Sequence, residues 1–298
     1  MICCSRSFFK LSLRRQLSLI ARGSLNTQEM RKKFTFSALY LSFRRSMMKH
    51  GNNNDKITER ILSAMNIQLL HMLDGARQAQ GLTVVIDVFR AFSFECYLFD
   101  AGVKKIFAVG AKETAYRLKE EHPDYVLAGE RKGIILPGFD CGNSPYQAST
   151  LELQGKTAVH TTSAGTQGIV NAVHATEIIT GSLVNARAIA QYIQNRRPET
   201  VSLVCMGLRG KELAAEDELC GRYIQSLLLG KPLDMQAELE QLRMDKTSQR
   251  FFDLQTQDVF PQEDYWMCTD VDKFPFVLHV AQREPDIFEV TRQDIDII

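Results

Sequence analysis

The segment TVVIDVF, residues 83–89, is a continuous run of apolar and β-branched residues interrupted by one aspartate. Such a run predicts a strand that is buried on both faces, as strands in the centre of a parallel sheet are. Similar short apolar segments follow at 105–109, 126–128, 156–160, 177–180 and 201–206. Helical patterns separate them, at 92–101, 112–121, the stretch ending at Val173, the stretch capped by Asn185, and 214–229. This alternation predicts an α/β fold with a mainly parallel sheet covered on both faces.

The C-terminal segment 231–298 shows a less regular pattern. Helices are predicted at 235–244 and 249–254, and a strand is predicted at 276–280. We expect this segment to pack on the sheet as a cap or as an edge. The body of the chain can also be divided into two half-units near Gln154-Gly155, although the pattern does not require that division.

Residues 1–64 differ in charge from the rest of the chain. They carry 13 Lys and Arg residues against three Asp and Glu residues, whereas residues 65–298 carry 23 against 32. Three interpretations are open: a mitochondrial-type transit peptide, a disordered basic arm, or non-native sequence translated upstream of a start at Met65. The third is favoured because the segment lacks a sustained amphipathic period and any core-like pattern. The acidic body argues against nucleic-acid binding.

The seven cysteines form no C-x-x-C pair, so the sequence indicates neither a zinc site nor a disulfide framework. Reduced thiols are therefore expected, which favours a cytoplasmic protein. No apolar run approaches the ~18 residues of a membrane helix, so no membrane association is expected.

The segment GERKGIILPGFDCGNSP, residues 129–145, follows the predicted strand at 126–128. Its four glycines and two prolines predict a shaped loop rather than a regular element. Carboxylate and amide side chains directly after a strand are typical of a functional site. Asn143 or Ser144 is expected to cap a helix that starts at Pro145. The alternative is a structural loop whose polar groups bond to its own backbone.

Three further segments place polar side chains at the predicted carboxyl ends of strands, where parallel sheets bind ligands. Asp87 and Arg90 follow the first strand and are candidates for metal binding or proton transfer, or else form a structural ion pair. Residues 161–166, TTSAGT, run into a helix and suit an anion, or else only cap that helix. Glu216 and Asp217 begin a helix, where they can reach a divalent ion or else only complement the helix dipole.

Together these segments predict two sets of site residues. The carboxylate set suits Mg²⁺, a hard ion that prefers oxygen ligands, and consists of Asp87, Glu130, Asp140, Glu216 and Asp217. The anion-binding set consists of Arg90, Arg131, Asn143, Thr161, Thr162, Ser163, Gly165 and Thr166. The candidates for catalysis are Asp87, Arg90, Glu130, Asp140 and Asp217, and Asp140→Asn is expected to abolish turnover. Mg²⁺ beside an anion site suggests phosphoryl chemistry on a small acidic metabolite.

Five segments, in their order along the chain, resemble the 2-phosphosulfolactate phosphatase family. They are VVIDVFRAFS at 84–93, LAGERKGIILPGFDCGNSP at 127–145, GKTAVHTTSAGTQGI at 155–169, GSLVNARAIAQYI at 181–193 and AAEDELCGRYI at 214–224. The second closely matches the family's LxGERxGxxxPGFDxGNSP loop. The resemblance spans residues 65–298 and does not touch residues 1–64.

This resemblance implies a three-layer α/β/α sandwich and a Mg²⁺-dependent phosphatase that releases phosphate from 2-phosphosulfolactate. A metal-activated water is expected rather than a phosphoenzyme. The implied partner is a small anionic phosphorylated substrate, and a homodimer is left open. Phe92, Ser163-Ala164-Gly165 and Ala215 depart from the family pattern, which puts the substrate in question more than the fold. The alternative is a non-catalytic paralogue that binds a phosphorylated metabolite as a sensor or partner protein.

Overall fold

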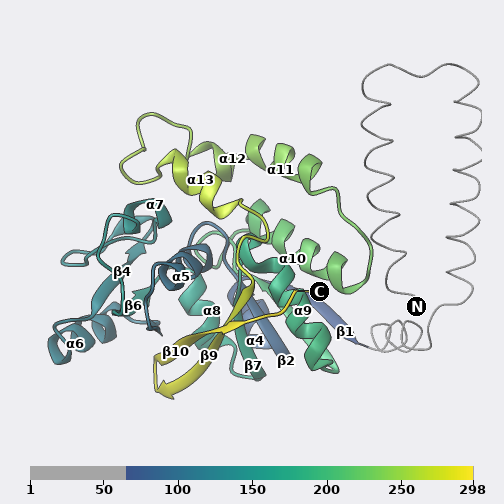
Figure 1. The fold of residues 1–298 in the computed structure, drawn as a ribbon, viewed down its shortest axis with the longest axis horizontal. Coiled ribbons are helices and arrows are strands. Elements are labelled where there is room, and N and C mark those ends of the chain that lie inside the picture. Colours follow the sequence, from purple (N-terminus) through teal and green to yellow (C-terminus); the bar gives the residue numbers. More distant parts are fainter. Residues whose placement is uncertain (1–64, 298) are drawn as a thin grey trace, which may run out of the picture. The chain divides into compact units, whose positions relative to one another are not determined.

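The structure is a computed structural model that describes residues 65–297. Its strands form one ten-stranded sheet in the order β1-β8-β2-β7-β9-β10-β3-β6-β4-β5 (Figure 1). The strands are β1 Asn66–His71, β2 Gly81–Ile86, β3 Lys105–Val109, β4 Val126–Arg131, β5 Ile134–Ile135, β6 Thr157–Thr161, β7 Ala175–Gly181, β8 Thr200–Cys205, β9 Phe276–Glu284 and β10 Ile287–Asp294. The expectations for residues 1–64 lie outside the described residues.

Ten α-helices are described within residues 65–297, none of them long and apolar enough to cross a bilayer. They are α4 Met72–Gln78, α5 Ala91–Asp100, α6 Lys112–Glu121, α7 Pro145–Ala148, α8 Gly165–Asn171, α9 Ala186–Arg196, α10 Ala215–Leu228, α11 Met235–Met244, α12 Lys246–Gln249 and α13 Gln262–Cys268. A short 3₁₀ helix, Leu183–Asn185, precedes α9.

Helices cover both faces of the sheet, as the apolar run at 83–89 predicts. Val85 of β2 belongs to one hydrophobic core, which also contains Phe94 of α5. Val84 of β2 belongs to another core, which contains Ile189 of α9. Because successive side chains of a strand point to opposite faces, β2 is buried on both sides. The predicted α/β/α sandwich around a mostly parallel, mixed sheet is confirmed.

The sheet consists of two parallel groups of strands that run in opposite directions. β1, β8, β2 and β7 are parallel to one another, and so are β3, β6 and β4. The antiparallel hairpin of β9 and β10 lies between the groups, pairing with β7 on one side and with β3 on the other. β6 begins just after the predicted division near Gln154-Gly155 and pairs between β3 and β4, which precede it. The chain on both sides of that point therefore contributes to one group of strands.

The C-terminal hairpin is central, so the prediction of an edge is wrong for β9 and β10. The error has a physical reason in the pattern of the two strands. Burial is confined to the first residues of each strand, and the remaining residues are mostly polar and exposed. Polar, exposed residues are the usual mark of an edge strand, whereas here they belong to the ends of strands that are longer than the pairing they make with β3 and β7.

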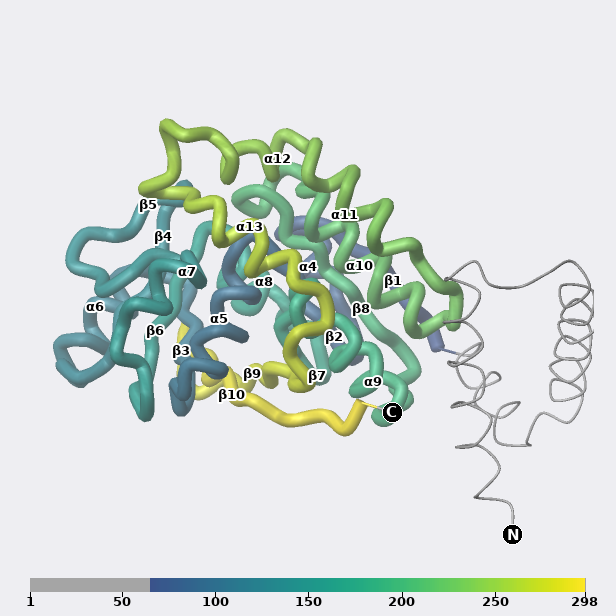
Figure 2. Tube along the Cα trace, turned by 45° about the horizontal axis from the view of Figure 1, so that its top comes forward, coloured from purple at the N-terminus to yellow at the C-terminus, as the bar shows by residue number. Residues whose placement is uncertain are grey.

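The predicted cap is formed instead by the segment from α11 to α13. Figures 1 and 2 show these helices lying together beside α10 and α5. Aromatic packing holds the segment in place, because the rings of Phe89 and Phe251 have centroids 5.0 Å apart and Tyr265 is buried. The helix expected at 249–254 is replaced by α12, since the Asp245 carboxylate accepts a hydrogen bond from Thr247 N and starts the helix earlier.

Local signals located several elements well. The strand at 105–109 and the helices at 112–121 and 235–244 have the predicted bounds. The Ser144 hydroxyl accepts a hydrogen bond from Gln147 N, which confirms the cap at the start of α7. Asn185, however, does not cap α9 with its side chain. β1, α4, α13 and β10 have no counterpart among the predicted elements.

The loop at 129–145 is more regular than predicted. β4 continues to Arg131 and pairs with the two residues of β5. Lys132 and Gly133 form the turn between them, with φ angles of +58° and +83°. Two successive positive φ angles are the geometry of a tight hairpin turn, and they favour glycine at the second position.

Candidate active site

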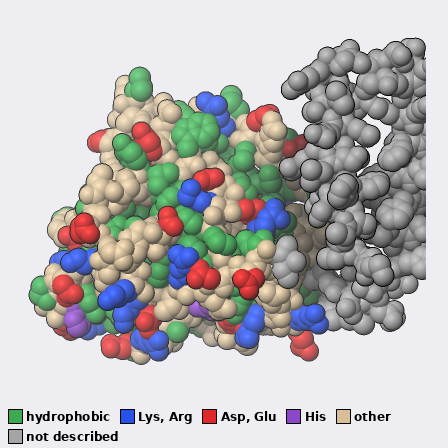
Figure 3. Space-filling view, viewed as in Figure 1, with side chains coloured by type: hydrophobic (Ala, Val, Ile, Leu, Met, Phe, Trp, Pro, Cys, Tyr) green, Lys and Arg blue, Asp and Glu red, His purple; other side chains and the backbone are tan. Residues whose placement is uncertain are grey.

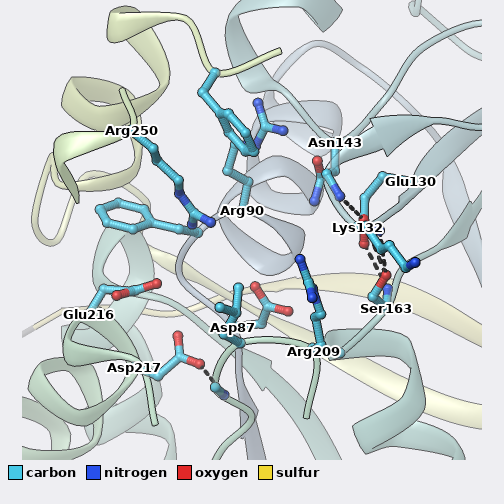
Figure 4. A pocket seen from close by; sticks show the side chains of 16 residues that line it. Asp87, Arg90, Glu130, Lys132, Asn143, Ser163, Arg209, Glu216, Asp217 and Arg250 are labelled. Atoms are coloured by element: carbon cyan, nitrogen blue, oxygen red, sulfur yellow. Dashed lines mark hydrogen bonds between the residues drawn. The ribbon is translucent and has the colours of Figure 1, made fainter. Parts of the chain in front are cut away.

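One cavity of about 270 Å³ lies where loops from both groups of strands meet, and we call it the inner cavity (Figure 4). The predicted site residues that line it are Asp87, Arg90, Glu130, Asn143, Ser163, Glu216 and Asp217. It is also lined by Phe89, Lys132, Gly133, Ala164, Gly207, Leu208, Arg209, Arg250 and Phe260. The fold thus brings together predicted residues from four separate segments of the chain.

The twist of the sheet accounts for this convergence of loops from oppositely directed strands. In a flat sheet, β2 and β4 would run in opposite directions, so their carboxyl ends would point away from each other. A twist of about 20–25° at each step accumulates, over the six steps from β2 to β4, into a rotation of about 120–150°. That rotation nearly reverses the second group, so its carboxyl ends turn toward those of the first.

Three buried carboxylates, those of Asp87, Glu216 and Asp217, form one side of the inner cavity (Figure 4). Burial raises the pKa of Asp87 to about 7, and repulsion by Glu130 and Glu216 adds to this effect. Burial also raises the pKa of Glu216 and of Asp217, and the charge of Asp87 contributes to the shift of Asp217. Carboxylates gathered in this way repel one another, and a bound cation would relieve that repulsion.

Backbone amides hold two of these carboxylates in place. Asp217 accepts hydrogen bonds from Val88 N and Gly207 N, both at 2.8 Å. Asp87 Oδ1 accepts one from Ala91 N at 3.1 Å. Asp217 therefore ties the loop after β2 to the loop after β8, and the two strands that carry these loops are neighbours in the sheet.

The donor set fits a hard divalent cation that keeps part of its water shell. Among residues 65–297, the one group of three whose ligand atoms lie within 4.8 Å of one another is His71, Cys205 and Glu218, outside the inner cavity. The three cavity carboxylates are more widely spaced, so they would not all contact one ion directly. Mg²⁺ is usually held by one or two carboxylates and retains several waters, and this spacing suits it.

Two arginines, Arg90 and Arg250, line the inner cavity on the side away from Asp87 and Asp217 (Figure 4). Arg90 donates to the buried carboxylate of Asp264 at 2.6 Å and to Val259 O at 2.9 Å. The guanidinium carbons of Arg90 and Arg250 each lie 4.9 Å from the centroid of the Phe260 ring. Burial lowers the pKa of Arg250, and the neighbouring charge of Arg90 adds to this. Arg90 is thus paired with a carboxylate, whereas Arg250 has no carboxylate oxygen within 4.0 Å among residues 65–297. A fixed, partly desolvated guanidinium of this kind suits a multiply charged anion such as a phosphate.

Glu130 holds the β4–β5 hairpin against the loop after β6. Its Oε1 accepts a hydrogen bond from Ser163 N at 2.7 Å, and its Oε2 accepts from Gly133 N at 2.5 Å and from Ser163 Oγ at 3.2 Å. Both carboxylate oxygens are thus engaged, and they position Ser163 and the turn that carries Lys132. Asn143 Oδ1, by contrast, is buried without a partner among the described residues, which leaves an acceptor for a ligand.

Six predicted site residues do not line the inner cavity: Arg131, Asp140, Thr161, Thr162, Gly165 and Thr166. The exposed carboxylate of Asp140 accepts a hydrogen bond from Leu127 N at 2.7 Å and so supports β4. Thr162 and Thr166 each accept the other's backbone N–H with their hydroxyls, at 3.1 Å and 2.9 Å, so they brace the start of α8. A polar loop residue can bond either to a ligand or to its own backbone, and the sequence pattern is the same in both cases.

The departures from the family pattern lie at different distances from the cavity. Phe92 is fully buried in the core and does not line the inner cavity. Gly165 lies between Phe92 and Asp87, because a Cβ there would be 3.1 Å from Phe92 Cζ and 3.0 Å from Asp87 Oδ2. Ala164 lines the inner cavity and Ala215 does not. Ser163 lines the inner cavity as well, so Ser163 and Ala164 are the departures that a ligand would meet.

Sequence reasoning missed Arg250 and Phe260, which close the inner cavity from the C-terminal segment. No motif or strand end marks them, and their approach depends on how the cap folds back. Lys132 lies inside the loop at 129–145, yet only the turn geometry shows that it reaches the cavity.

Comparisons with known proteins identify the family of this chain. The sequence model of a family described as 2-phosphosulpholactate phosphatase matches residues 69–282. A protein of Bacillus subtilis (strain 168) named "Probable 2-phosphosulfolactate phosphatase" is 31% identical over 204 residues, which cover 67% of this chain and 87% of that protein. A protein of the same name from Clostridium tetani (strain Massachusetts / E88) is 30% identical over 203 residues, covering 67% and 84%.

Proposed function

Because this chain belongs to the 2-phosphosulfolactate phosphatase family, we propose that it is a Mg²⁺-dependent phosphatase that converts 2-phosphosulfolactate to sulfolactate and phosphate. The observation that carries the proposal is the pairing of three buried carboxylates with two fixed arginines across one cavity. The names of the relatives favour turnover over the alternative of a non-catalytic sensor.

In this proposal, Asp87, Glu216 and Asp217 hold Mg²⁺ directly or through water. When bound, the ion supplies charge neutralisation and a coordinated water of lowered pKa. Asp217 is fixed by two backbone amides, so the acidic side needs little rearrangement when the ion binds.

The opposite side of the cavity binds the substrate. Arg90 and Arg250 bind the oxygens of the phosphate, and their contacts with Asp264 and Phe260 hold them in place before the substrate arrives. Asn143 Oδ1 accepts a hydrogen bond from a water molecule, because the ionised substrate carries no donor. Lys132 and Arg209 also line the cavity, and they bind the remaining acidic groups of the substrate, its carboxylate and its sulfonate.

The test measures phosphate release by the full-length chain from racemic 2-phosphosulfolactate, with added Mg²⁺ and with EDTA. We expect release that requires Mg²⁺ and that stops when EDTA is added. Release that persists in EDTA would refute the metal dependence. Tight binding of the compound without any release would support the sensor alternative instead.

A further inference from the structure

A second cavity, of about 560 Å³, adjoins the inner cavity and is called the outer basin. Lys132, Ser163 and Arg209 line both cavities, so the two adjoin at these residues. Lys112 and Lys211 line the outer basin and do not line the inner cavity. A ligand in the inner cavity could therefore extend past Lys132 and Arg209 into a space with its own cationic side chains.

The outer basin carries more positive charge than its own carboxylate neutralises. Five cationic side chains line it, those of Lys112, Arg131, Lys132, Arg209 and Lys211, against the single carboxylate of Glu113. Among residues 65–297, Lys112 alone of these five has a carboxylate oxygen within 4.0 Å, that of Glu113 at 3.9 Å. On the face of the molecule drawn in Figure 3, cationic and anionic side chains are interspersed.

The positive charge of Arg131 at the outer basin is not paired with a carboxylate among the described residues. Its guanidinium donates to Glu130 O at 2.7 Å, Gly110 O at 3.1 Å and Thr161 Oγ1 at 3.0 Å. These uncharged acceptors fix the orientation of the guanidinium and leave its charge uncompensated. Cations gathered in this way repel one another, so an anion in the basin would be stabilised by all of them.

We propose that the outer basin binds a second phosphate, carried by a substrate whose scissile phosphate lies in the inner cavity. This inference rests on the proposed phosphatase function and extends it to bisphosphorylated acids. The inner cavity, at about 270 Å³, is near the lower end of ligand pockets and suits a small acid with one phosphate. A phosphate fits the outer basin better than a carboxylate, because a tetrahedral, multiply charged group can engage several cations at once.

The test uses matched pairs of 2-phosphorylated hydroxy acids, three to six carbons long, that end in either a phosphate or a hydroxyl group. The shortest pair is 2,3-bisphosphoglycerate and 2-phosphoglycerate. For at least one chain length, kcat/KM of the full-length enzyme should be about tenfold higher for the bisphosphorylated member. The double variant Lys112→Gln/Lys211→Gln should lose this preference through KM, with the monophosphorylated member changed less than about twofold.

The matched control is Lys104→Gln/Lys231→Gln, which removes two exposed lysines that line neither cavity. It should keep the preference. Equal kcat/KM within every pair, or a preference that Lys112→Gln/Lys211→Gln retains, would overturn the proposal.

Calorimetry separates the proposal from two other outcomes. If the wild type binds one more sulfate than the double variant, while each pair is hydrolysed equally, the basin binds a free anion and the proposal of a substrate phosphate is wrong. If none of the acids is hydrolysed, the proposed phosphatase function fails, and binding of the pairs tests the basin alone. Tighter binding of bisphosphorylated acids by the wild type than by the double variant would then support the basin, and equal binding would overturn it.

Discussion

The two groups of strands contribute different chemistry to the inner cavity. The loops after β2 and β8 carry the three buried carboxylates, those of Asp87, Glu216 and Asp217, together with the side chains of Arg90 and Arg209. The loops after β4 and β6 carry Lys132 and Ser163. The one carboxylate that this group places in the cavity is that of Glu130, and it accepts hydrogen bonds from backbone N–H groups and from a hydroxyl. The first group therefore carries the proposed cation ligands beside one of the proposed phosphate-binding arginines, Arg90, whereas the carboxylate of the second group is already engaged by the protein itself. The twisted sheet places the two opposite each other.

Removing an acid from the first group should have the largest effect. Glu216→Gln or Asp217→Asn should lower kcat/KM for phosphate release about 10²–10³-fold, because each removes a charge from the set proposed to hold Mg²⁺. Steady-state phosphate release with titrated Mg²⁺ measures this, and the Mg²⁺ requirement should rise as well. Glu218→Gln is the matched control, since Glu218 lies next to Asp217 on α10 but bonds to His71. Activity within about twofold of wild type for Glu216→Gln would remove that residue from the set.

A moderate effect should appear in the pH dependence of stability, through Asp87. Its pKa of about 7 in the folded chain exceeds the value of about 3.9 in an unfolded chain. Between these values the folded state binds more protons, so the contribution of Asp87 to stability is present at low pH and is lost as the pH rises through 7. Without Mg²⁺, the Tm of wild type minus that of Asp87→Asn should therefore fall by several degrees from pH 5.5 to pH 8.

Scanning calorimetry measures these Tm values, and adding Mg²⁺ gives a second test. At pH 8 it should raise the Tm of the wild type more than that of Asp87→Asn, because the ionised carboxylate is the form that attracts the cation. A Tm difference between the two proteins that does not change with pH would contradict the raised pKa of Asp87.

The smallest effect is expected at Asp140, which belongs to the second group and lies outside the cavity. Asp140→Asn should leave kcat/KM within about twofold of wild type, contrary to the expectation from sequence. It should weaken the hydrogen bond to Leu127 N and lower the free energy of unfolding by about 0.5–1.5 kcal/mol. Chemical denaturation and phosphate release measure the two quantities. A folded Asp140→Asn protein without activity would return this carboxylate to the catalytic set.

Motifs in the sequence located the site better than they assigned roles within it. Asp87, Glu130, Glu216 and Asp217 all reach the inner cavity, because each follows a buried strand whose end the apolar pattern marks. Glu130 and Asp140 look alike in sequence, as carboxylates of one loop. In the fold, Glu130 is buried at the cavity and Asp140 is exposed beside β4.

The sequence by itself determined the α/β class, the strand bounds at 105–109, the helix bounds at 112–121 and the family, because periodicity, caps and motifs are local properties of the chain. The tertiary structure alone decided the central place of β9 and β10, the opposed directions of the two groups, and the entry of Arg250 and Phe260 into the cavity. The physical reason is that strand order and accumulated twist arise from contacts between residues far apart in the chain, and no local pattern encodes them.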